Sequence, residues 1–266
     1  MSHMLRPLSS SDKCMLFCDL DGTLLYSHRH PYDGECVWVE QLHGHPQSFV
    51  TGQTYGYFQE QKWLNVIPLT TRNHAQFERL REMTEQLHFP EALICNGAVL
   101  LVGMQEDEQW RQESLQLAEP FLPALRKLET LAKVCAGAEN VICSDPFLFY
   151  VRSADVQTVY RTLSDAADAM HMIVWRDARK VYCIPRVFSK ANAARRFCKR
   201  AGAARFMAAG DGELDISMLC AAEIGFCPER LREQRTAEAG LCFCGGWFSD
   251  TLCQRLEQMR IEGGMV

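Results

Sequence analysis

Short apolar segments alternate with amphipathic segments toward both ends of the chain. The apolar segments are bounded by polar or turn residues, which indicates buried strands at 15–18, 66–69, 92–95, 205–209, 223–227 and 241–244. Between them apolar residues recur with a helical period, which predicts helices at 73–87, 190–201, 214–221, 229–239 and 248–261. This alternation is typical of an α/β fold with a parallel sheet.

The middle of the chain has a different pattern. It predicts a helix at 119–134, a strand at 147–151, a helix at 155–170 and two strands at 172–175 and 181–184. A mixed segment that interrupts a parallel sheet indicates an inserted lobe. We therefore expect a Rossmann-like core from residues 12–102 and 181–266, with an α+β cap at 103–180.

Composition narrows the class of protein. The 266 residues are 47% hydrophobic, which is enough for a large buried core, and the net charge is −5 without a long Lys/Arg run. This balance disfavours nucleic acid and anionic membranes as partners. There is no apolar segment long enough to span a membrane, and residues 1–12 are too polar for a signal peptide. We expect a cytoplasmic monomer or small homo-oligomer with small soluble partners.

The thirteen cysteines are scattered through apolar segments without a Cys-x-x-Cys pair. This distribution favours buried, reduced thiols over disulfides or a metal site. Cys242 and Cys244 share one face of a predicted strand, but no further ligand lies near them in sequence.

Two carboxylates, Asp19 and Asp21, follow the first predicted strand, and Gly22 provides a turn directly after them. Two negative charges held this close are costly unless a cation or a changed protonation state compensates them. This pair therefore indicates chemistry more than packing.

Three further motifs follow, and two of them also come directly after predicted strands. They are Thr70-Thr71-Arg72, Lys190 at the start of a helix, and the segment from Asp211 to Asp215. Strand ends of a parallel sheet meet at its carboxyl edge, where open α/β folds bind ligands. In type and order the four motifs resemble those of the haloacid dehalogenase (HAD) superfamily of phosphatases.

The residue types suit phosphoryl transfer through a covalent intermediate. Asp19 is the expected nucleophile that forms an aspartyl-phosphate, and Asp21 the expected general acid and base. Asp19, Asp211 and Asp215 offer hard oxygen ligands for Mg²⁺, and the resemblance adds the backbone carbonyl of Asp21. Since transport ATPases of the superfamily carry Thr where this chain has Asp21, phosphate-ester chemistry is favoured over ion pumping.

The phosphoryl oxygens need positive or hydrogen-bonding partners. The hydroxyl of Thr70 and the ammonium of Lys190 are the expected partners. Arg72 and Thr71 are expected to line the same site.

The inserted lobe, together with Asn96-Gly97-Ala98, resembles the type IIB (C2B-capped) branch, which includes Cof-like and sucrose-phosphate phosphatases. One position departs from that branch, since Leu214 stands where Asn is usual before the last acid. Loss of such an outer contact lowers metal affinity or rate by roughly ten- to a hundredfold, and Glu213 is a partial substitute.

The resemblance implies an Mg²⁺-dependent phosphomonoesterase acting on a small phosphorylated metabolite, with a sugar phosphate favoured. Asn96 and the cap arginines Arg152, Arg176 and Arg179 are expected to bind the substrate, although solvated strand and turn positions would also explain the arginines. Two alternatives stay open: a phosphomutase of the same cap type, and a weakly catalytic binding or regulatory protein.

The segment 26–62 predicts a hairpin with strands around 37–39 and 49–50 and a turn at 44–46. A helix at 54–61 should follow, with Thr51 as its cap. The hairpin region is rich in histidine and aromatic residues, but their spacing matches no zinc signature. We expect it to cover the entrance of the active site.

Overall fold

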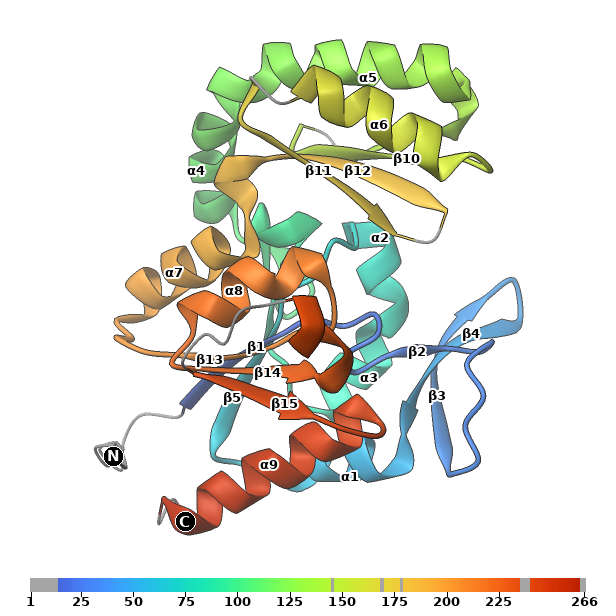
Figure 1. Ribbon diagram of the computed structural model, residues 1–266. Helices are drawn as coiled ribbons and strands as arrows, with labels where there is room; N and C mark the ends of the chain where they lie inside the picture. The colour runs from blue at the N-terminus through green and yellow to red at the C-terminus, as the bar shows by residue number, and fades with distance from the viewer. Residues whose placement is uncertain (1–13, 145, 168–169, 178, 235–239, 264–266) are drawn as a thin grey trace.

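A five-stranded parallel sheet forms the centre of the protein, in the order β15-β14-β13-β1-β5 (Figure 1). The computed structural model describes residues 14–144, 146–167, 170–177, 179–234 and 240–263. The strands are β1 (Cys14–Cys18), β5 (Leu64–Pro68), β13 (Met207–Ala209), β14 (Ile224–Pro228) and β15 (Leu241–Cys244). This arrangement confirms the predicted α/β core.

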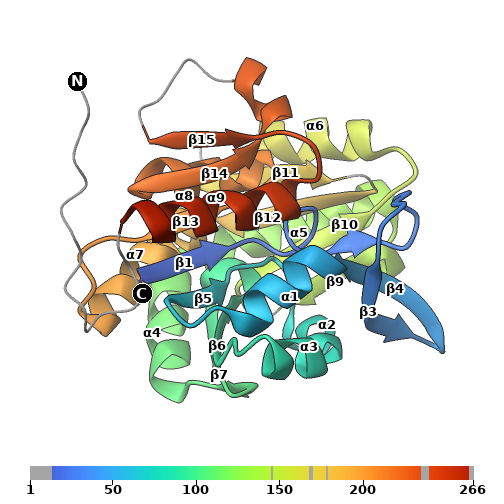
Figure 2. The same ribbon diagram turned by 90° about the horizontal axis from the view of Figure 1, so that it is seen from below.

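Alternate residues of β1 serve two different apolar layers, as the two-residue period of a strand requires. Leu16 packs in the layer beneath α1 (Gly52–Glu60) and α9 (Phe248–Glu262), which lie side by side across one face of the sheet (Figure 2). Phe17 packs in the opposite layer, beneath α7 (Lys190–Ala201) and α8 (Ile216–Ala221). Helices on both faces hold the carboxyl edge of the sheet rigidly.

The predicted strand at 92–95 is present as β6 (Glu91–Ile94), but it is not hydrogen-bonded as a sixth parallel strand. It pairs antiparallel with β7 (Val99–Val102), which is followed by β8 (Gln105–Glu106). A single parallel bridge between Leu69 and Leu93 links it to the core. Asn96-Gly97 between β6 and β7 is a turn signal for such a hairpin, which the prediction of a single parallel strand left unused.

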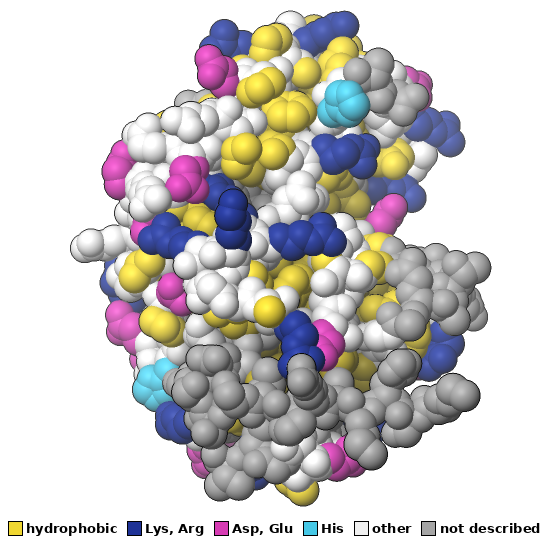
Figure 3. All heavy atoms as spheres, turned by 90° about the vertical axis from the view of Figure 1, so that its left-hand side faces the viewer, with side chains coloured by type: hydrophobic (Ala, Val, Ile, Leu, Met, Phe, Trp, Pro, Cys, Tyr) yellow, Lys and Arg dark blue, Asp and Glu magenta, His cyan; other side chains and the backbone are white. Residues whose placement is uncertain are grey.

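Helix α4 (Glu108–Ala118) was not predicted and belongs to the core by its contacts. Its Trp110 is fully buried, donates from Nε1 to the carbonyl of Gly97 at 3.2 Å, and lies under the guanidinium of Arg196 from α7. Arg196 also pairs with Glu113 of α4 at 3.0 Å. On this side of the molecule, Lys and Arg side chains gather across the middle, with acidic side chains among them (Figure 3).

The cap is a four-stranded antiparallel sheet in the order β11-β12-β10-β9, with α5 (Leu122–Ala136) and α6 (Val156–Ala167) on its outer face (Figure 1). Val181 and Cys183 pack against these helices, whereas Tyr182 packs with the core. The strands are β9 (Val141–Ser144), β10 (Leu148–Arg152), β11 (Met172–Asp177) and β12 (Lys180–Pro185). Because α4 packs on the core and β12 on the cap, packing favours later boundaries than the predicted 103 and 180.

The expected hairpin is present, with β3 (Cys36–Leu42) and β4 (His45–Thr51) joined by a turn at His43 and Gly44. A third short strand, β2 (Tyr26–Ser27), pairs with β4. Thr51 caps α1 as predicted, since its side chain accepts from the backbone N–H of Thr54. We call residues 26–51 the hairpin segment below.

Four predicted helices are not α-helical throughout, and those at 119–134 and 214–221 begin with the 3₁₀ turns Glu119–Phe121 and Glu213–Asp215. The 73–87 helix is divided into α2 (His74–Phe77), a 3₁₀ turn (Glu78–Leu80) and α3 (Arg81–Gln86). The 229–239 helix is a 3₁₀ helix over Glu229–Gln234, and residues 235–239 lie outside the described part, as do 168–169 of the predicted 155–170 helix. Across the residues that the structure describes, none of the helices has the length and apolarity needed to cross a bilayer.

We predict that Trp110→Ala lowers the free energy of unfolding by about 3–5 kcal/mol, because it leaves a cavity between α4 and α7 and removes the Nε1 hydrogen bond. Urea unfolding followed by circular dichroism would measure it. The control is Val134→Ala, at a side chain that is 79% exposed, which should change stability by less than about 0.5 kcal/mol. Similar effects of the two changes would contradict the packing described for α4.

Candidate active site

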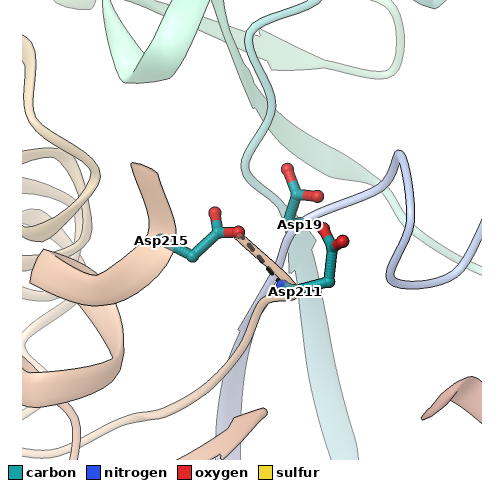
Figure 4. A group of neighbouring side chains, drawn as sticks. All are labelled: Asp19, Asp211 and Asp215. Carbon is teal, nitrogen blue, oxygen red and sulfur yellow. Dashed lines mark hydrogen bonds between the residues drawn. The ribbon is translucent and has the colours of Figure 1, made fainter. Parts of the chain in front are cut away.

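Three carboxylates from two loops, one after β1 and one after β13, meet at the carboxyl edge of the parallel sheet (Figure 4). Asp19 follows β1 and Asp211 follows the neighbouring parallel strand β13, so the sheet itself places them side by side. Asp215 ends the 3₁₀ turn Glu213–Asp215, and its Oδ2 accepts from the backbone N–H groups of Asp211 and Gly212 at 3.1 and 3.0 Å. One oxygen from each of the three acids lies within 4.8 Å of the others.

Glycines allow this close approach of backbone and carboxylates. Gly22 has φ +87°, and a Cβ there would lie 2.5 Å from Oδ2 of Asp211. A Cβ at Gly210 would lie 2.4 Å from the Cβ of Asp215. Any larger residue at either position would displace an acid of the triad.

Lys190 compensates part of the negative charge. It is the first residue of α7 and only 2% exposed, and its Nζ donates to Oδ1 of Asp19 and Oδ1 of Asp215, both at 2.5 Å. Burial alone would lower the pKa of this lysine, but the two carboxylates raise it above its ordinary value. Lys190 is therefore a permanent cation within the triad.

The triad keeps an excess of negative charge. Burial raises the pKa of Asp19 well above its usual range; Lys190 lowers it in part, and the charges of Asp215 and Asp211 raise it further. Arg230 donates to the carboxylate of Asp211 and, at 2.9 and 3.2 Å, to its backbone carbonyl. When all three acids are ionised, as metal ligation requires, the two cations leave one negative charge uncompensated, and the hard oxygen atoms fit a divalent metal ion.

Asp21 lies beside the triad and has a different partner. Arg72 donates from Nε to Oδ2 at 2.8 Å and from Nη2 to Oδ1 at 2.7 Å. The surrounding cleft partly removes Asp21 from water, which would raise its pKa, but the guanidinium outweighs this effect and lowers it. The Asp21 side chain is 54% exposed toward the cleft above it.

This cleft has a volume of about 1290 Å³ and lies between the core, the hairpin segment and the cap. The triad, Asp21 and Lys190 line its core side. The hairpin segment and the inner face of the cap line the rest, chiefly with Ser27, His28, Arg29, His30, Glu40, Gln47, Trp175, Asp177, Lys180 and Tyr182. The acidic groups therefore face a space large enough for a small metabolite.

No family model matches the chain, and no curated protein matches it in sequence. Solved structures match it in fold over nearly their whole length. Sucrose-phosphatase from Synechocystis sp. PCC6803, solved with sucrose and phosphate, aligns with a TM-score of 0.62 at 14% identity, covering 92% of this chain and 97% of that one. A HAD subclass IIB sugar phosphatase aligns with a TM-score of 0.65 at 15% identity, covering 96% and 100%.

A HAD-superfamily phosphatase from Bacteroides thetaiotaomicron aligns with a TM-score of 0.58 at 17% identity over 100% of both chains. This chain has the haloacid dehalogenase fold, with the cap of subclass IIB. The predicted fold class and the predicted type of cap are thereby confirmed.

The structure brings the predicted motif residues together, but Thr70 and Thr71 differ in their exposure. Thr71 lines the cleft, whereas Thr70 is 1% exposed and its hydroxyl accepts from the backbone N–H of Arg72 at 3.2 Å. Asn96 is fully buried and donates from Nδ2 to the carbonyl of Phe188 at 2.6 Å, just before the Lys190 helix. Its Oδ1 has no partner among the described residues.

The predicted cap arginines separate into two groups. Arg176 lines the cleft, but its guanidinium bonds Gln157 and lies over the ring of Tyr160, both on α6. Arg152 and Arg179 line a separate hollow of about 490 Å³ at the end of the cap sheet. Substrate binding by Arg152, Arg176 and Arg179 stays a prediction.

At the position where Asn is usual, Leu214 packs partly buried against the apolar core and also lines the cleft. Glu213 beside it is exposed at the cleft wall. An apolar contact thus takes the place of the expected polar one near the triad.

Several cleft residues have no distinguishing signal in the sequence. In the sequence, Glu40 is an isolated acid within an apolar strand and Arg230 lies outside every motif. Trp175 cannot be told there from a packing residue. Two members of the histidine and aromatic group of the hairpin region, His28 and His30, line the cleft; the others are Tyr32, Trp38, His43 and His45. Among the described residues, the metal-type cluster is the aspartate triad and includes no histidine.

We predict that Lys190→Met lowers the free energy of unfolding by about 3–5 kcal/mol near neutral pH, because it leaves Asp19 and Asp215 buried without their shared cation. A raised folded pKa contributes stability at low pH that is lost as pH rises through that pKa. Lys190→Met removes the interaction that lowers the pKa of Asp19, so this pKa rises further. The loss of unfolding free energy should therefore be larger at about pH 8 than at about pH 5.

Urea unfolding of both proteins at the two pH values would measure this difference. The control is Lys133→Met, which removes an exposed lysine paired with Glu129 on α5. Equal losses for Lys190→Met at both pH values would show that the buried carboxylates are not the cause.

Proposed function

We propose that this protein is an Mg²⁺-dependent phosphomonoesterase that hydrolyses a small phosphorylated metabolite, with a sugar phosphate as the favoured class. The observation that carries the proposal is the convergence of Asp19, Lys190, Asp211 and Asp215 at the sheet edge, with Asp21 facing the same cleft. The sugar phosphatases of the same fold support it.

Asp19, Asp211 and Asp215 would hold the Mg²⁺ ion through carboxylate oxygens. Oxygen ligands of this kind suit Mg²⁺, and the uncompensated charge of the triad favours a cation there. When bound, the ion supplies charge stabilisation for an anionic nucleophile that approaches an anionic phosphate.

In the first step an oxygen of Asp19 attacks phosphorus, and a new O–P bond replaces the bond between phosphorus and the substrate alcohol. Asp21 gives its proton to the leaving oxygen. The negative charge of the phosphate ester beside Asp21 favours the protonated carboxyl at this stage, against the effect of Arg72.

In the second step water attacks the aspartyl-phosphate, Asp21 takes the proton from water, and the bond between Asp19 and phosphorus breaks to release phosphate. Lys190 holds a positive charge beside Asp19 throughout both steps. Thr71 on the cleft wall supplies a hydroxyl group for the phosphoryl oxygens. Thr70, the other hydroxyl group expected to do so, lies behind it.

The cap offers a surface for the leaving alcohol. Trp175, Tyr182 and Tyr150 form an aromatic row on the inner face of the cap sheet, with neighbouring ring centroids 5.4 and 5.3 Å apart. Asp177 and Lys180 line the cleft beside this row. An aromatic surface flanked by charged groups suits a ring with one apolar face and several hydroxyls, as in a sugar.

We predict that Asp19→Asn abolishes hydrolysis, on the order of a 10³-fold loss or more, whereas Asp21→Asn lowers kcat by about 10²- to 10⁴-fold and leaves Mg²⁺ affinity within about twofold. The reason is that Asp21 acts through its carboxyl in proton transfer, while its backbone carbonyl survives the change. Phosphate release from a sugar-phosphate panel and from p-nitrophenyl phosphate would measure activity, and calorimetric Mg²⁺ titration would measure affinity.

The same assay tests the reaction class. Wild-type activity should disappear with EDTA and return with excess Mg²⁺. If wild type and Asp19→Asn are equally inert on every ester, catalysis is excluded and a ligand-binding role takes its place.

We predict that Trp175→Ala raises KM for a hydrolysed sugar phosphate about 3- to 10-fold, with little change in kcat, because one face of the leaving group loses its aromatic partner. Steady-state kinetics would measure it. Trp38→Ala, at an exposed tryptophan of the hairpin segment outside the cleft, is the matched control. An unchanged KM in Trp175→Ala would exclude stacking on the cap row.

A further inference from the structure

Glu40 is a buried carboxylate outside the aspartate triad, and every hydrogen-bonding site it offers is used. It is 4% exposed and belongs to β3 of the hairpin segment. Oε1 accepts from Nη1 of Arg72 at 3.0 Å and Nε of Arg79 at 2.8 Å. Oε2 accepts from Nη2 of Arg72 at 3.0 Å and the hydroxyl of Ser48 at 2.7 Å. Four acceptor sites of a carboxylate are thus occupied.

Arg72 is saturated in the same way. Its five N–H donors make two bonds to Asp21, two to Glu40 and one, at 3.4 Å, to the carbonyl of Gln76. Asp21 and Glu40 therefore each bind the guanidinium through two hydrogen bonds. These bonds hold Arg72 in one orientation, in which it donates to both oxygens of the Asp21 carboxyl.

A β-bulge turns Glu40 toward Arg72. Trp38 pairs with Phe49 and Glu40 pairs with Ser48, so the register shifts between these two residues of β3. Residues two apart on a regular strand share a face, yet Trp38 is 48% exposed and Glu40 is buried. Bulges redirect side chains in this way, often beside active sites.

The hairpin segment that carries Glu40 is fixed to the core. Asp250 of α9 accepts from the hydroxyls of Thr51 and, at 2.8 Å, Thr54, at the junction of β4 and α1. Tyr26 and Phe49 pack in an aromatic group with Trp247, which precedes α9. Glu40 therefore holds its place through the core, independently of the cap.

From this geometry we propose that Glu40 is a positioning residue for the reaction: it fixes the guanidinium of Arg72, which in turn holds the Asp21 carboxyl toward the substrate oxygen. The inference rests on the proposed phosphatase function for its kinetic consequence, but not for the geometry itself. Without Glu40, Arg72 loses its second bidentate partner and can rotate, and Asp21 loses its fixed orientation. Misplacement of a reacting group by about 1 Å costs roughly a hundredfold in rate.

The kinetic test compares two leaving groups. In glucose 6-phosphate the leaving alkoxide needs the proton of Asp21, whereas p-nitrophenolate leaves without one. Glu40→Gln should lower kcat for glucose 6-phosphate about 10- to 100-fold and for p-nitrophenyl phosphate less than about threefold, with Mg²⁺ affinity unchanged. Ser48→Ala, which removes one hydrogen bond to Glu40, should lower the first rate by about two- to tenfold and serves if Glu40→Gln does not fold.

The matched control is Glu35→Gln, the same change at an exposed glutamate of the same hairpin segment. It should leave both rates at the wild-type level. Equal loss on both substrates in Glu40→Gln, or an effect of similar size in Glu35→Gln, would overturn the inference, because Glu40 would then only support the hairpin.

A second measurement separates this inference from the proposed function. In ¹⁵N spectra of the folded proteins, Arg72 should show distinct Nη1 and Nη2 signals in wild type, since its rotation is blocked, and an averaged signal in Glu40→Gln. An inactive wild type would refute the phosphatase while these spectra still decide the role of Glu40. Distinct signals that persist in Glu40→Gln would overturn the inference whatever the activity.

Discussion

The contact of Lys190 with Asp19 and Asp215 is the interaction on which the rest of the site depends. Neighbouring parallel strands bring Asp19 and Asp211 together, and Gly22 and Gly210 leave room for the side chains of Asp211 and Asp215. Such a group of buried acids would be very costly without a cation inside it. The ammonium at the start of α7 makes the arrangement stable and still leaves negative charge for a metal ion.

The two aspartates that follow β1 are separated chemically by their cations. Asp19 is buried with a raised pKa and contacts a lysine, whereas Asp21 faces the cleft with a pKa lowered by a bidentate arginine. In the proposed reaction these different surroundings suit one residue type to two roles, as general acid–base chemistry beside a nucleophile requires. The hairpin segment and the cap line the cleft above these aspartates. Both interrupt the pattern of parallel strands in the sequence.

These two elements contribute in different ways. The hairpin segment is tied to α9 and places Glu40 behind Arg72, so in the proposed reaction it supports the catalytic groups from the core side. The cap lines the cleft with Trp175, Tyr182 and two charged side chains, which the proposed function assigns to the leaving group. On this proposal, separate parts of the chain serve chemistry and recognition.

The sequence by itself determined the parallel core and the inserted cap, because these depend on local patterns, and the resemblance to the haloacid dehalogenase motifs singled out Asp19, Asp211 and Asp215. Strand period, helix period and a carboxylate directly after an apolar strand are all visible within a few residues. Lys190 and its helix were equally clear, since the bounds 190–201 agree with α7. The antiparallel pairing of β6 with β7 was not predicted, although Asn96-Gly97 between them is a local turn signal, and the helix α4 was not predicted either.

Only the tertiary structure decided which charges pair. Glu40 and Arg72 are 32 positions apart, and a bulge that no sequence pattern marks turns the acid inward. In the same way Trp175 reads as a core residue until the pairing of β11 with β12 places it on the cleft side of the cap. Side-chain direction and long-range contact follow from packing between elements, and packing is not encoded in any local stretch of residues.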